Sequence, residues 1–376
     1  MYIEGKARIG HYGKSFLNPH GRVSRDISIA AASSILHGRK SSKVLDSTAA
    51  TGIRGIRYAL ESGAKEVTLL EINETAYKDA AKNVKSNRIK ATLAHESIQG
   101  FANNTDEHFD IIDLDPFGSA APNIFDLLKV SRDGTYLFVT STDTAVLCGA
   151  SAMACRRIYD SVPMHNEFCK EVGMRILIGY VAKTAFQFGF GISPVLSLSY
   201  LHYMRSFIRL DHGIANVHDS MSEMGYVHYC EKCMFRSCEK GYLPKLLKCP
   251  SCGGALRSAG RMWCGNLKNN EFIDGMIAET DTLSGDSMDI IKKIRGEADI
   301  PLYYSIPHMT KRMAVGSVSP AEVAACLKLK GWNVSGTHFE DSSLRTDADS
   351  HAVAECIKKI RKRMERAKKG NRRPTS

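Results

Sequence analysis

Short apolar runs that end in polar or acidic residues recur through the first 200 positions of the chain. A strand that is covered on both faces of a sheet is apolar throughout, and polar residues follow where it leaves the sheet. Helical patterns lie between most of these runs, and such alternation is typical of a doubly wound α/β sheet. The pattern predicts seven strands, at residues 43–46, 66–71, 91–94, 111–114, 136–140, 175–180 and 195–200. Because the last two lie close together in the sequence, we expect them to form an antiparallel pair at one edge.

Acidic residues mark the ends of the first four predicted strands. Asp46 ends the first and Glu71 the second, Glu96 and Ser97 follow the third, and Asp115 follows the fourth. In an open α/β sheet, ligands bind in the crevice beyond the carboxyl ends of the strands. We therefore expect a binding site at this edge.

The turn after the first strand consists mainly of small residues, from Ser47 to Gly52, and leads into a helix. Small residues let a ligand approach the backbone and the helix N-terminus. The turn lacks the G-x-G-x-x-G fingerprint of dinucleotide binding, which favours S-adenosylmethionine (SAM) as the ligand. Glu71 would then hydrogen-bond the ribose hydroxyls, and Glu96 with Ser97 would lie near the adenine.

The segment Asp115-Pro116-Phe117 supplies groups suited to an exocyclic amino group of a nucleobase. A carboxylate accepts a hydrogen bond from N–H, proline leaves its carbonyl free, and the ring offers a stacking face. It resembles the Asp-Pro-Pro-Tyr and Asn-Pro-Pro-Tyr segments of amino-methyltransferases. An ordinary turn at the end of a strand is the alternative interpretation.

Two C-x-x-C pairs predict a metal site. Cys230 and Cys233, followed by Cys249 and Cys252, supply four thiolates for a tetrahedral zinc ion, and glycines follow the second pair as in a zinc ribbon. Four protein ligands imply a closed, structural site, and a redox-active pair is the alternative. The chain has eleven cysteines, and this odd, dispersed count favours thiols over disulfides.

Length and composition are consistent with a soluble, cytoplasmic protein of two domains. The chain has 376 residues, 43% of them hydrophobic, and it contains neither an apolar run long enough for a membrane span nor a signal-peptide core. We expect no membrane association, and nothing in the sequence implies an obligate protein partner.

Positive charge is concentrated at the C-terminus. Residues 358–376 carry a net charge of +9 out of +11 for the whole chain. Such a tail favours contact with nucleic-acid phosphates, which adds affinity without selecting a base. A solvated helix end is the alternative.

Several segments together resemble the archaeal-type tRNA (guanine(26)-N2)-dimethyltransferase family. Besides the two C-x-x-C pairs, the matching segments are Phe16–Pro19, Ser24–Asp26, Asp46, Thr51–Arg57, Asp115–Ser119, Glu171–Leu177, Thr337–Phe339 and Thr346–Ala348. The match covers nearly the whole chain. Leu17, where the family usually has tyrosine, and Ala120, where it usually has proline, are the two departures.

The resemblance implies a reaction. The family transfers one and then a second methyl group from SAM to N2 of guanine 26 in tRNA, and a stacked base has to be flipped out for this chemistry. Phe16 and Phe117 are then expected on the two faces of the base. Asp115 and the Pro116 carbonyl are expected to accept hydrogen bonds from N2.

The resemblance also implies the SAM-binding residues. These are Arg25, Asp46, Arg54, Glu71, Glu96 and Ser97. Asp46 would close the first turn, and Arg25 and Arg54 would pair with the carboxylate of the methionine moiety.

We therefore expect a Rossmann-like, seven-stranded methyltransferase domain at residues 1–211, with an N-terminal substrate loop. A C-terminal α+β domain that binds tRNA would occupy residues 212–376, with its four-cysteine zinc element at about 228–256. Helices are expected at 321–330 and 352–363. Methylation of an adenine or cytosine amino group, a nicotinamide dehydrogenase and a non-catalytic RNA-binding protein are the rival hypotheses. The missing glycine fingerprint argues against the second, and the acids that end the strands argue against the third.

Overall fold

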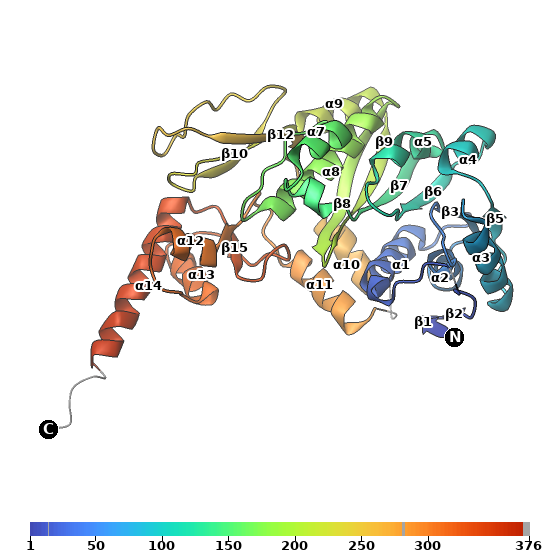
Figure 1. Cartoon of the computed structure of the whole chain (residues 1–376), viewed down its shortest axis with the longest axis horizontal. Helices are drawn as coiled ribbons and strands as arrows, with labels where there is room; N and C mark the ends of the chain where they lie inside the picture. Colours follow the sequence, from blue (N-terminus) through green and yellow to red (C-terminus); the bar gives the residue numbers. More distant parts are fainter. Residues whose placement is uncertain (14, 280–282, 371–376) are drawn as a thin grey trace. The chain divides into compact units, whose positions relative to one another are not determined.

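The computed structural model describes residues 1–13, 15–279 and 283–370 (Figure 1). Contacts divide the chain into two compact units: residues 1–144, 177–223 and 266–295 form the first, and residues 145–176, 224–265 and 296 onward form the second. The contact-based division is therefore discontinuous and falls inside helix α8 (Cys169–Phe186). The functional division at residue 211 stays a prediction.

The first unit contains a seven-stranded sheet, as the sequence predicts. Its strand order is β5-β4-β3-β6-β7-β9-β8; β5 to β7 pair in parallel, and the β8–β9 hairpin is antiparallel and ends the sheet at β8. The strands are β3 (Lys43–Asp46), β4 (Glu66–Leu70), β5 (Thr92–Ala94), β6 (Phe109–Leu114), β7 (Ser131–Ser141), β8 (Phe190–Tyr200) and β9 (Tyr203–His212).

One predicted strand is wrong. Residues 175–180 belong to helix α8, and the seventh strand is β9, which the pattern analysis missed. The run from Arg175 to Tyr180 is almost continuously apolar because this part of the helix is mostly buried. A short apolar run of this kind does not distinguish a buried strand from a buried helix. The expected antiparallel edge pair exists, but β9 is the partner of β8.

Helices cover both faces of the sheet. Figure 1 places the group α1 (Arg22–Leu36), α2 (Ile53–Glu61) and α3 (Glu74–Ser86) opposite α4 (Ile98–Asn104) and α5 (Ala121–Lys129). This follows from right-handed crossovers, because the chain proceeds outward from β3 in one direction and from β6 in the other. The strand order thus reverses between β3 and β6, where ligands bind in such folds.

Register brings two acids together at this reversal. Asp46 on β3 pairs with Asp113 on β6, and both are buried. The site described below lies at this end of the two strands.

Helices from a later part of the sequence complete the first unit. Helices α10 (Asn270–Ala278) and α11 (Gly285–Arg295) lie beside α1 in Figure 1, and the Ser287 hydroxyl donates to Asp26 Oδ2 over 3.1 Å. This packing explains why residues 266–295 group with the first unit. Its other elements are β1 (Tyr2–Glu4), β2 (Ala7–Ile9), a 3₁₀ helix (Pro19–Gly21) and α9 (Ile214–Ser222).

The second unit contains two three-stranded sheets. One, in the order β11-β10-β12, consists of Met224–Tyr229 (β10), Arg236–Lys240 (β11) and Arg257–Trp263 (β12), and the other, β13-β15-β14, of Tyr304–Ser305 (β13), Val334–Ser335 (β14) and Ser343–Thr346 (β15). Its helices are α7 (Ala152–Tyr159), α12 (Ile306–Arg312), α13 (Pro320–Leu329) and α14 (Ser350–Gly370), and the short α6 (Thr144–Leu147) begins at the unit boundary. Helices α13 and α14 confirm the predictions at 321–330 and 352–363.

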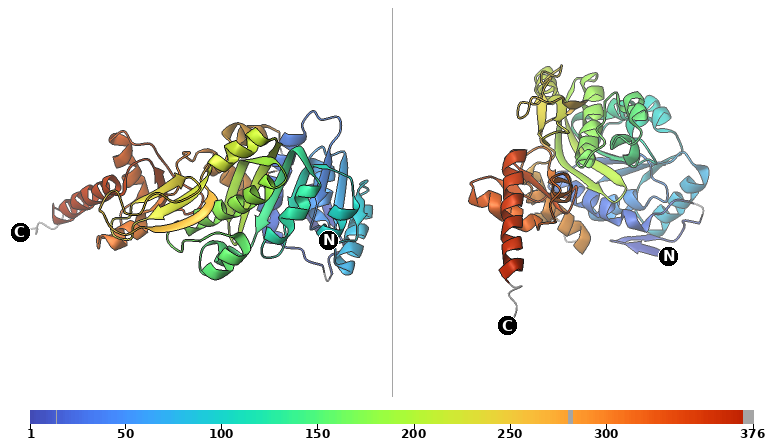
Figure 2. Two further views of the ribbon diagram at one scale, coloured as in Figure 1. Left: turned by 90° about the horizontal axis from the view of Figure 1, so that it is seen from above. Right: turned by 60° about the vertical axis from the view of Figure 1, so that its left-hand side comes forward.

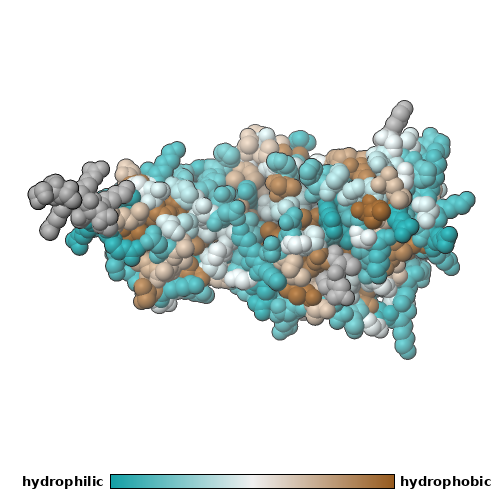
Figure 3. Space-filling view, turned by 90° about the horizontal axis from the view of Figure 1, so that it is seen from below, coloured by the Kyte–Doolittle hydropathy of each residue, from teal (hydrophilic) through white to brown (hydrophobic). Residues whose placement is uncertain are grey.

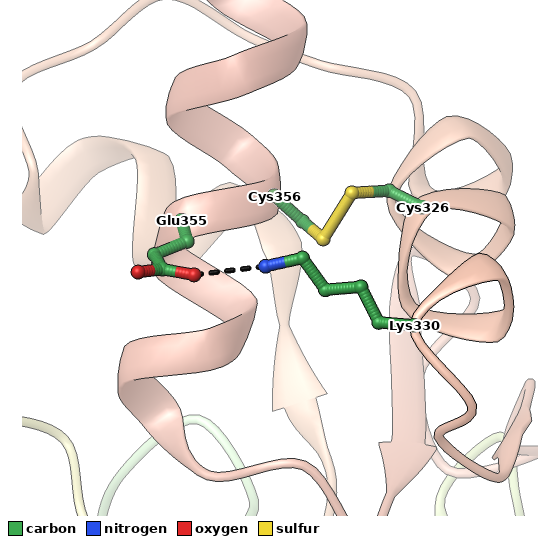
Figure 4. Close-up of a disulfide and its surroundings, with 4 residues drawn as sticks. All are labelled: Cys326, Lys330, Glu355 and Cys356. Atoms are coloured by element: carbon green, nitrogen blue, oxygen red, sulfur yellow. Dashed lines mark hydrogen bonds and ion pairs between the residues drawn. A yellow bond between two sulfur atoms is a disulfide. The ribbon is translucent and has the colours of Figure 1, made fainter.

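Helices α13 and α14 are joined covalently (Figure 4). Cys326 and Cys356 form a disulfide with a Cα–Cα distance of 5.9 Å, and the Lys330 ammonium donates to Glu355 over 2.8 Å beside it. The expectation that all cysteines are thiols is therefore wrong for this pair. The sequence pattern did not reveal it because the partners lie on two helices that meet only in the folded unit.

None of the helices formed by the described residues combines the length and apolar composition needed to traverse a lipid bilayer. On the face seen in Figure 3, hydrophilic side chains predominate and hydrophobic ones form small separate groups.

Candidate active site

A cavity of about 690 Å³ lies in the first unit at the carboxyl ends of β3, β4, β6 and β7. Its volume is in the range of small-molecule sites. The cavity wall includes nine of the ten predicted catalytic and cofactor-binding residues, namely Phe16, Arg25, Arg54, Glu71, Glu96, Ser97, Asp115, Pro116 and Phe117. The tenth, Asp46, is buried beneath the first turn and does not line the cavity.

The first turn is held by the two acids that end β3 and β4. Asp46 Oδ2 accepts the Gly55 N–H over 2.9 Å, and Glu71 Oε2 accepts the Ala50 N–H over 2.7 Å. A Cβ on Gly55 would lie 2.6 Å from Leu69 Cγ, so glycine is required for α2 to pack against β4. Asp46 therefore shapes the turn from below, while Glu71 remains in the cavity wall.

Glu96 and Ser97 lie where β5 leads into α4. Ser97 is the N-cap of that helix, and its hydroxyl accepts the Gly100 N–H over 3.0 Å. Ser97 thus has a structural role in addition to its place in the cavity wall. Caps of this kind fix the start of a helix, which determines where the preceding Glu96 lies.

Asp115 directly follows β6 and points to the positive charge of α2. Its carboxylate accepts a short hydrogen bond from Arg54 Nη2. Burial alone would raise the pKa of Asp115, but the positive charges of Arg54 and Arg205 outweigh that effect and lower the pKa below its ordinary value. Asp115 is therefore an ionised hydrogen-bond acceptor at the cavity wall.

Arg54 is part of a buried cluster of charges. Its Nη1 donates to the Ser28 hydroxyl over 2.9 Å and lies 3.4 Å from Asp113 Oδ2. Arg205 from β9 donates to the same Asp113 oxygen over 2.7 Å. Two arginines thus share one buried carboxylate, and Arg54 also reaches Asp115.

Arg25 is oriented by an acidic partner from the N-terminal hairpin. Its Nε and Nη2 donate to the two oxygens of Glu4, each over 2.6 Å, and Nη2 also donates to the Asn18 carbonyl over 3.0 Å. This bidentate pair fixes the guanidinium plane. Arg25 lines the cavity with its orientation already set.

Phe16 and Phe117 meet at the cavity mouth. Their ring centroids are 4.5 Å apart with an interplanar angle of 76°, and they are 51% and 75% exposed. Large exposed aromatic side chains are uncommon unless they bind something. A flat group stacked on both rings needs about 7 Å between them, because each contact takes about 3.5 Å. The rings therefore have to separate before they can enclose a base.

Sequence reasoning missed three residues of this region. Thr140 from β7 and Tyr203 from β9 line the cavity, and Arg205 lies behind it. Arg205 and Tyr203 were missed because β9 was not predicted. The signal was present as a single arginine within the apolar run from Met204 to Leu210, since an unpaired charge is rarely buried.

The four predicted metal ligands lie together in the second unit. Within the described residues, the sulfur atoms of Cys230, Cys233, Cys249 and Cys252 are all within 4.8 Å of one another. Tetrahedral zinc with Zn–S bonds of about 2.3 Å requires sulfur atoms about 3.8 Å apart, so the cluster fits that ion. The residues after each pair, Met234 and Gly253, both have left-handed φ angles, of 62° and 69°. The two pairs thus form matching knuckles.

Comparisons with known proteins agree with this geometry. A model of the family "N2,N2-dimethylguanosine tRNA methyltransferase" matches residues 2–358. The chain is 32% identical over 365 residues to a tRNA (guanine(26)-N(2))-dimethyltransferase from Pyrococcus horikoshii, covering 92% of each chain. It is 35% identical to the protein of the same name from Methanospirillum hungatei, covering 83% of this chain and 84% of that one.

A solved structure is similar over almost the whole fold. It is a complex of Trm1 from Pyrococcus horikoshii with S-adenosyl-L-methionine, which superposes with a TM-score of 0.86 at 31% identity and covers 94% of this chain and 98% of that one. Coverage of this extent takes in both units, so the likeness exceeds that of a shared sheet. The chain belongs to the N2,N2-dimethylguanosine tRNA methyltransferase family.

Proposed function

We propose that this chain binds SAM in the cavity of the first unit and transfers methyl groups to N2 of guanine 26 in tRNA. The observation that carries the proposal is Asp115, an ionised carboxylate at the end of β6 and in the wall of a cavity. Family membership supplies the substrate, and the cavity wall supplies groups that suit it.

The proposed SAM site uses the predicted residues of the cavity wall. Glu71 would accept hydrogen bonds from the ribose hydroxyls, with Glu96 and Ser97 near the adenine. Arg25 and Arg54 would bind the methionine carboxylate, since guanidinium groups pair with carboxylates in a bidentate manner. Their acidic partners, Glu4 and Asp115, already orient them. Bound SAM would supply an electrophilic methyl group on its sulfonium.

The guanine would enter as a flipped-out base. The exposed rings of Phe16 and Phe117 would separate and stack on its two faces, which repays part of the unstacking free energy. In a duplex or a stacked tRNA core, N2 cannot reach the methyl donor. Phe117 belongs to the same turn as Asp115, so stacking would bring the edge of the base to the carboxylate.

Asp115 would orient N2 and stabilise the charge that develops on it. Its carboxylate would accept one N2–H and the Pro116 carbonyl the other, while the N2 lone pair faces the methyl carbon. The N2–methyl bond forms as the sulfonium–methyl bond breaks, and the amino group becomes positively charged until it loses a proton. Because the pKa of Asp115 is low, the residue acts mainly as an acceptor and a fixed negative charge, and the proton passes to water. Positioning and electrostatic stabilisation of this kind provide most of the rate in direct displacements.

Guanine N2 carries two hydrogens, so the same step can occur twice. The monomethylated base would present its remaining N2–H to Asp115 after SAM has been renewed. The dimethylated product is therefore chemically accessible without a second site.

The second unit is proposed to bind tRNA. Helix α14 carries much of the basic segment, with Lys358, Lys359, Lys362 and Arg366 among its exposed residues. A zinc ion held by the four cysteines would stabilise the β10–β12 element and would take no part in the chemistry, because no ligand position is left open.

The experiment is a methylation assay with product identification. Purified protein is incubated with SAM and an unmodified tRNA transcript, and the digested nucleosides are identified by mass spectrometry. The expected products are N2-methylguanosine and N2,N2-dimethylguanosine, absent from a transcript with adenine at position 26. Asp115→Asn should lower the rate by about 10²- to 10³-fold, the usual cost of losing one electrostatic contact to a reacting group.

Glu74→Gln is a matched control because Glu74 is an exposed acid on α3 outside the cavity wall. It should leave the rate unchanged. Methylated adenosine or cytidine as the product would overturn the proposed substrate. A fully active Asp115→Asn variant would overturn the proposed role of Asp115.

A further inference from the structure

A buried chain of hydrogen bonds runs from β9 to Asp115. Arg205 Nη1 donates to Thr140 Oγ1 through a short hydrogen bond, and the Thr140 hydroxyl is hydrogen-bonded to the Asp115 carboxylate. Arg205 is fully buried and Thr140 almost so. The chain therefore links the second layer of the site to its reactive edge.

Chemistry determines the direction of both hydrogen bonds. A guanidinium group has only donors, so Thr140 Oγ1 accepts from Arg205. An ionised carboxylate has only acceptors, so the single hydroxyl proton of Thr140 is directed at Asp115. The positive charge on Arg205 polarises this hydroxyl and makes it a stronger donor.

Arg205 is held by contacts on several sides. Its Nη2 donates to Asp113 Oδ2 over 2.7 Å and to the Ser28 hydroxyl over 2.8 Å. The guanidinium carbon lies 5.0 Å from the ring centroid of Phe207 and 5.8 Å from that of Phe138, which adds cation–π attraction. The donor that Arg205 presents to Thr140 is thus held in one place.

Asp115 consequently has two anchors from different elements. Arg54 on α2 holds the carboxylate from one side, and Thr140 on β7 from another. A carboxylate held at one point rotates about its Cβ–Cγ bond, whereas two contacts fix its plane. A fixed plane determines where an amino group that donates to it will lie.

We propose that Thr140 and Arg205 are positioning residues for methyl transfer, which hold the Asp115 carboxylate in the orientation that aligns guanine N2 with the methyl donor. The inference rests on the proposed function. Arg205 is not among the residues that line the cavity, so it acts through Thr140. No role for either residue follows from the sequence motifs, because both lie outside them.

The test compares Thr140→Val with Thr140→Ser. Valine keeps the shape and β-branching of threonine but removes the hydroxyl, whereas serine keeps the hydroxyl. Methyl transfer is measured in a single turnover with saturating enzyme, SAM and tRNA transcript, together with the Kd for SAM and the thermal midpoint. We expect Thr140→Val to be about 10- to 100-fold slower, the size of effect produced by small misplacements of a reacting pair. Thr140→Ser should be within about threefold of the parent, with SAM affinity and the thermal midpoint of both variants nearly unchanged.

A second variant tests the inner residue. Arg205→Lys keeps the charge but replaces the planar fork with a single ammonium, which cannot serve Thr140, Ser28 and Asp113 with the same geometry. We expect it to slow the single turnover at least as much as Thr140→Val. Combined with Thr140→Val it should cause little further loss, because both changes break the same chain.

Three results would overturn the inference: a parent-like rate for Thr140→Val, a Thr140→Ser variant as slow as Thr140→Val, or a loss confined to the KM for tRNA. Failure of the proposed function is distinguishable from these, because the parent protein itself would then form no N2-methylated guanosine in the same assay.

Discussion

At the scale of single residues, five charged side chains share the space where β3 and β6 end. Three are acids, Asp46, Asp113 and Asp115, and two are arginines, Arg54 and Arg205. The arginines contact Asp113, and Arg54 also contacts Asp115, so these two acids are neutralised directly. The Asp46 carboxylate is held instead by the backbone, through the Gly55 N–H.

The outcome differs between the two carboxylates that border the site. Burial, together with the neighbouring charge of Asp113, raises the pKa of Asp46 to about 7, although Arg54 opposes the shift. Asp115 is lowered instead, since two positive charges act on it and lower its pKa. The acid beneath the turn is thus close to its neutral form at physiological pH, while the acid in the cavity wall is ionised.

A stability prediction follows for Asp46. Its folded pKa of about 7 exceeds the ordinary value of about 3.9 for aspartate, so between these pH values the folded chain binds more protons than the unfolded chain. The free energy of unfolding should therefore fall as pH rises from 4 to 7, on the order of 3 kcal/mol for this group. Asp46→Asn keeps an acceptor for Gly55 but cannot ionise, so its stability relative to the parent should rise over that range. Urea denaturation of both proteins at pH 5, 6, 7 and 8 measures the difference, and parallel pH profiles would contradict the prediction.

At the scale of elements, the sequence predicted most of the sheet and most of the cavity wall. Strands whose apolar run ends in a marked polar residue, such as β3 before the first turn and β6 before Asp115, were located correctly. Their identity is encoded locally, by the period of the pattern and by the residue at which it stops.

The elements that were missed depend on tertiary contacts. Residues 175–180 resemble a strand because the helix they form is mostly buried, and β9 pairs with β7 and β8, whose positions the local pattern does not specify. Arg205 is stable in the core only because Asp113, Ser28 and Thr140 surround it in the folded unit. The Cys326–Cys356 disulfide is a similar case, since its partners are 30 residues apart.

The knuckle element offers a prediction about metal removal. Its β10–β12 sheet has three short strands, too few to be stable without further support, so the four thiolates and their ion should contribute strongly to its folding. Cys252→Ser should lose bound zinc, measured by plasma mass spectrometry, and residues 241–248 should become more sensitive to protease. The Kd for SAM should stay the same, because the cavity wall belongs to the first unit.

The matched control is Cys238→Ser. Cys238 lies on β11 of the same sheet but is not one of the four clustered thiols. It should retain zinc and protease resistance. Unchanged zinc content in Cys252→Ser would contradict the assignment of the ligands.

At the scale of the whole molecule, charge is distributed very unevenly. Residues 358–376 carry +9, and the preceding 357 residues only +2. The family match ends at residue 358, so the basic segment lies beyond the part that defines the family. Its first part forms the last turns of α14, the long red helix of Figures 1 and 2, while residues 371–376 lie outside the described residues.

This distribution suggests that tRNA affinity and base selection are separable. Base selection would reside in the cavity, where Asp115, Phe16 and Phe117 contact one nucleotide. Affinity would depend on phosphate contacts, which are insensitive to sequence and weaken as salt rises. Exposed lysines and arginines on α14 are suited only to the second task.

Deleting residues 361–376 tests this separation, because the disulfide at Cys356 and the buried residues Ile357 and Ile360 remain. We expect a higher KM for tRNA and a shallower dependence of log KM on log salt, with a loss of about 0.7–0.9 in slope for each phosphate contact removed. The modified nucleotide and the single-turnover rate at saturating tRNA should not change. Lys358→Glu combined with Lys362→Glu is the control that keeps the helix, and it should reproduce part of the effect. Methylation at a different nucleotide after the deletion would show that the basic segment selects the target, and an unchanged salt dependence would show that it does not contact phosphates at all.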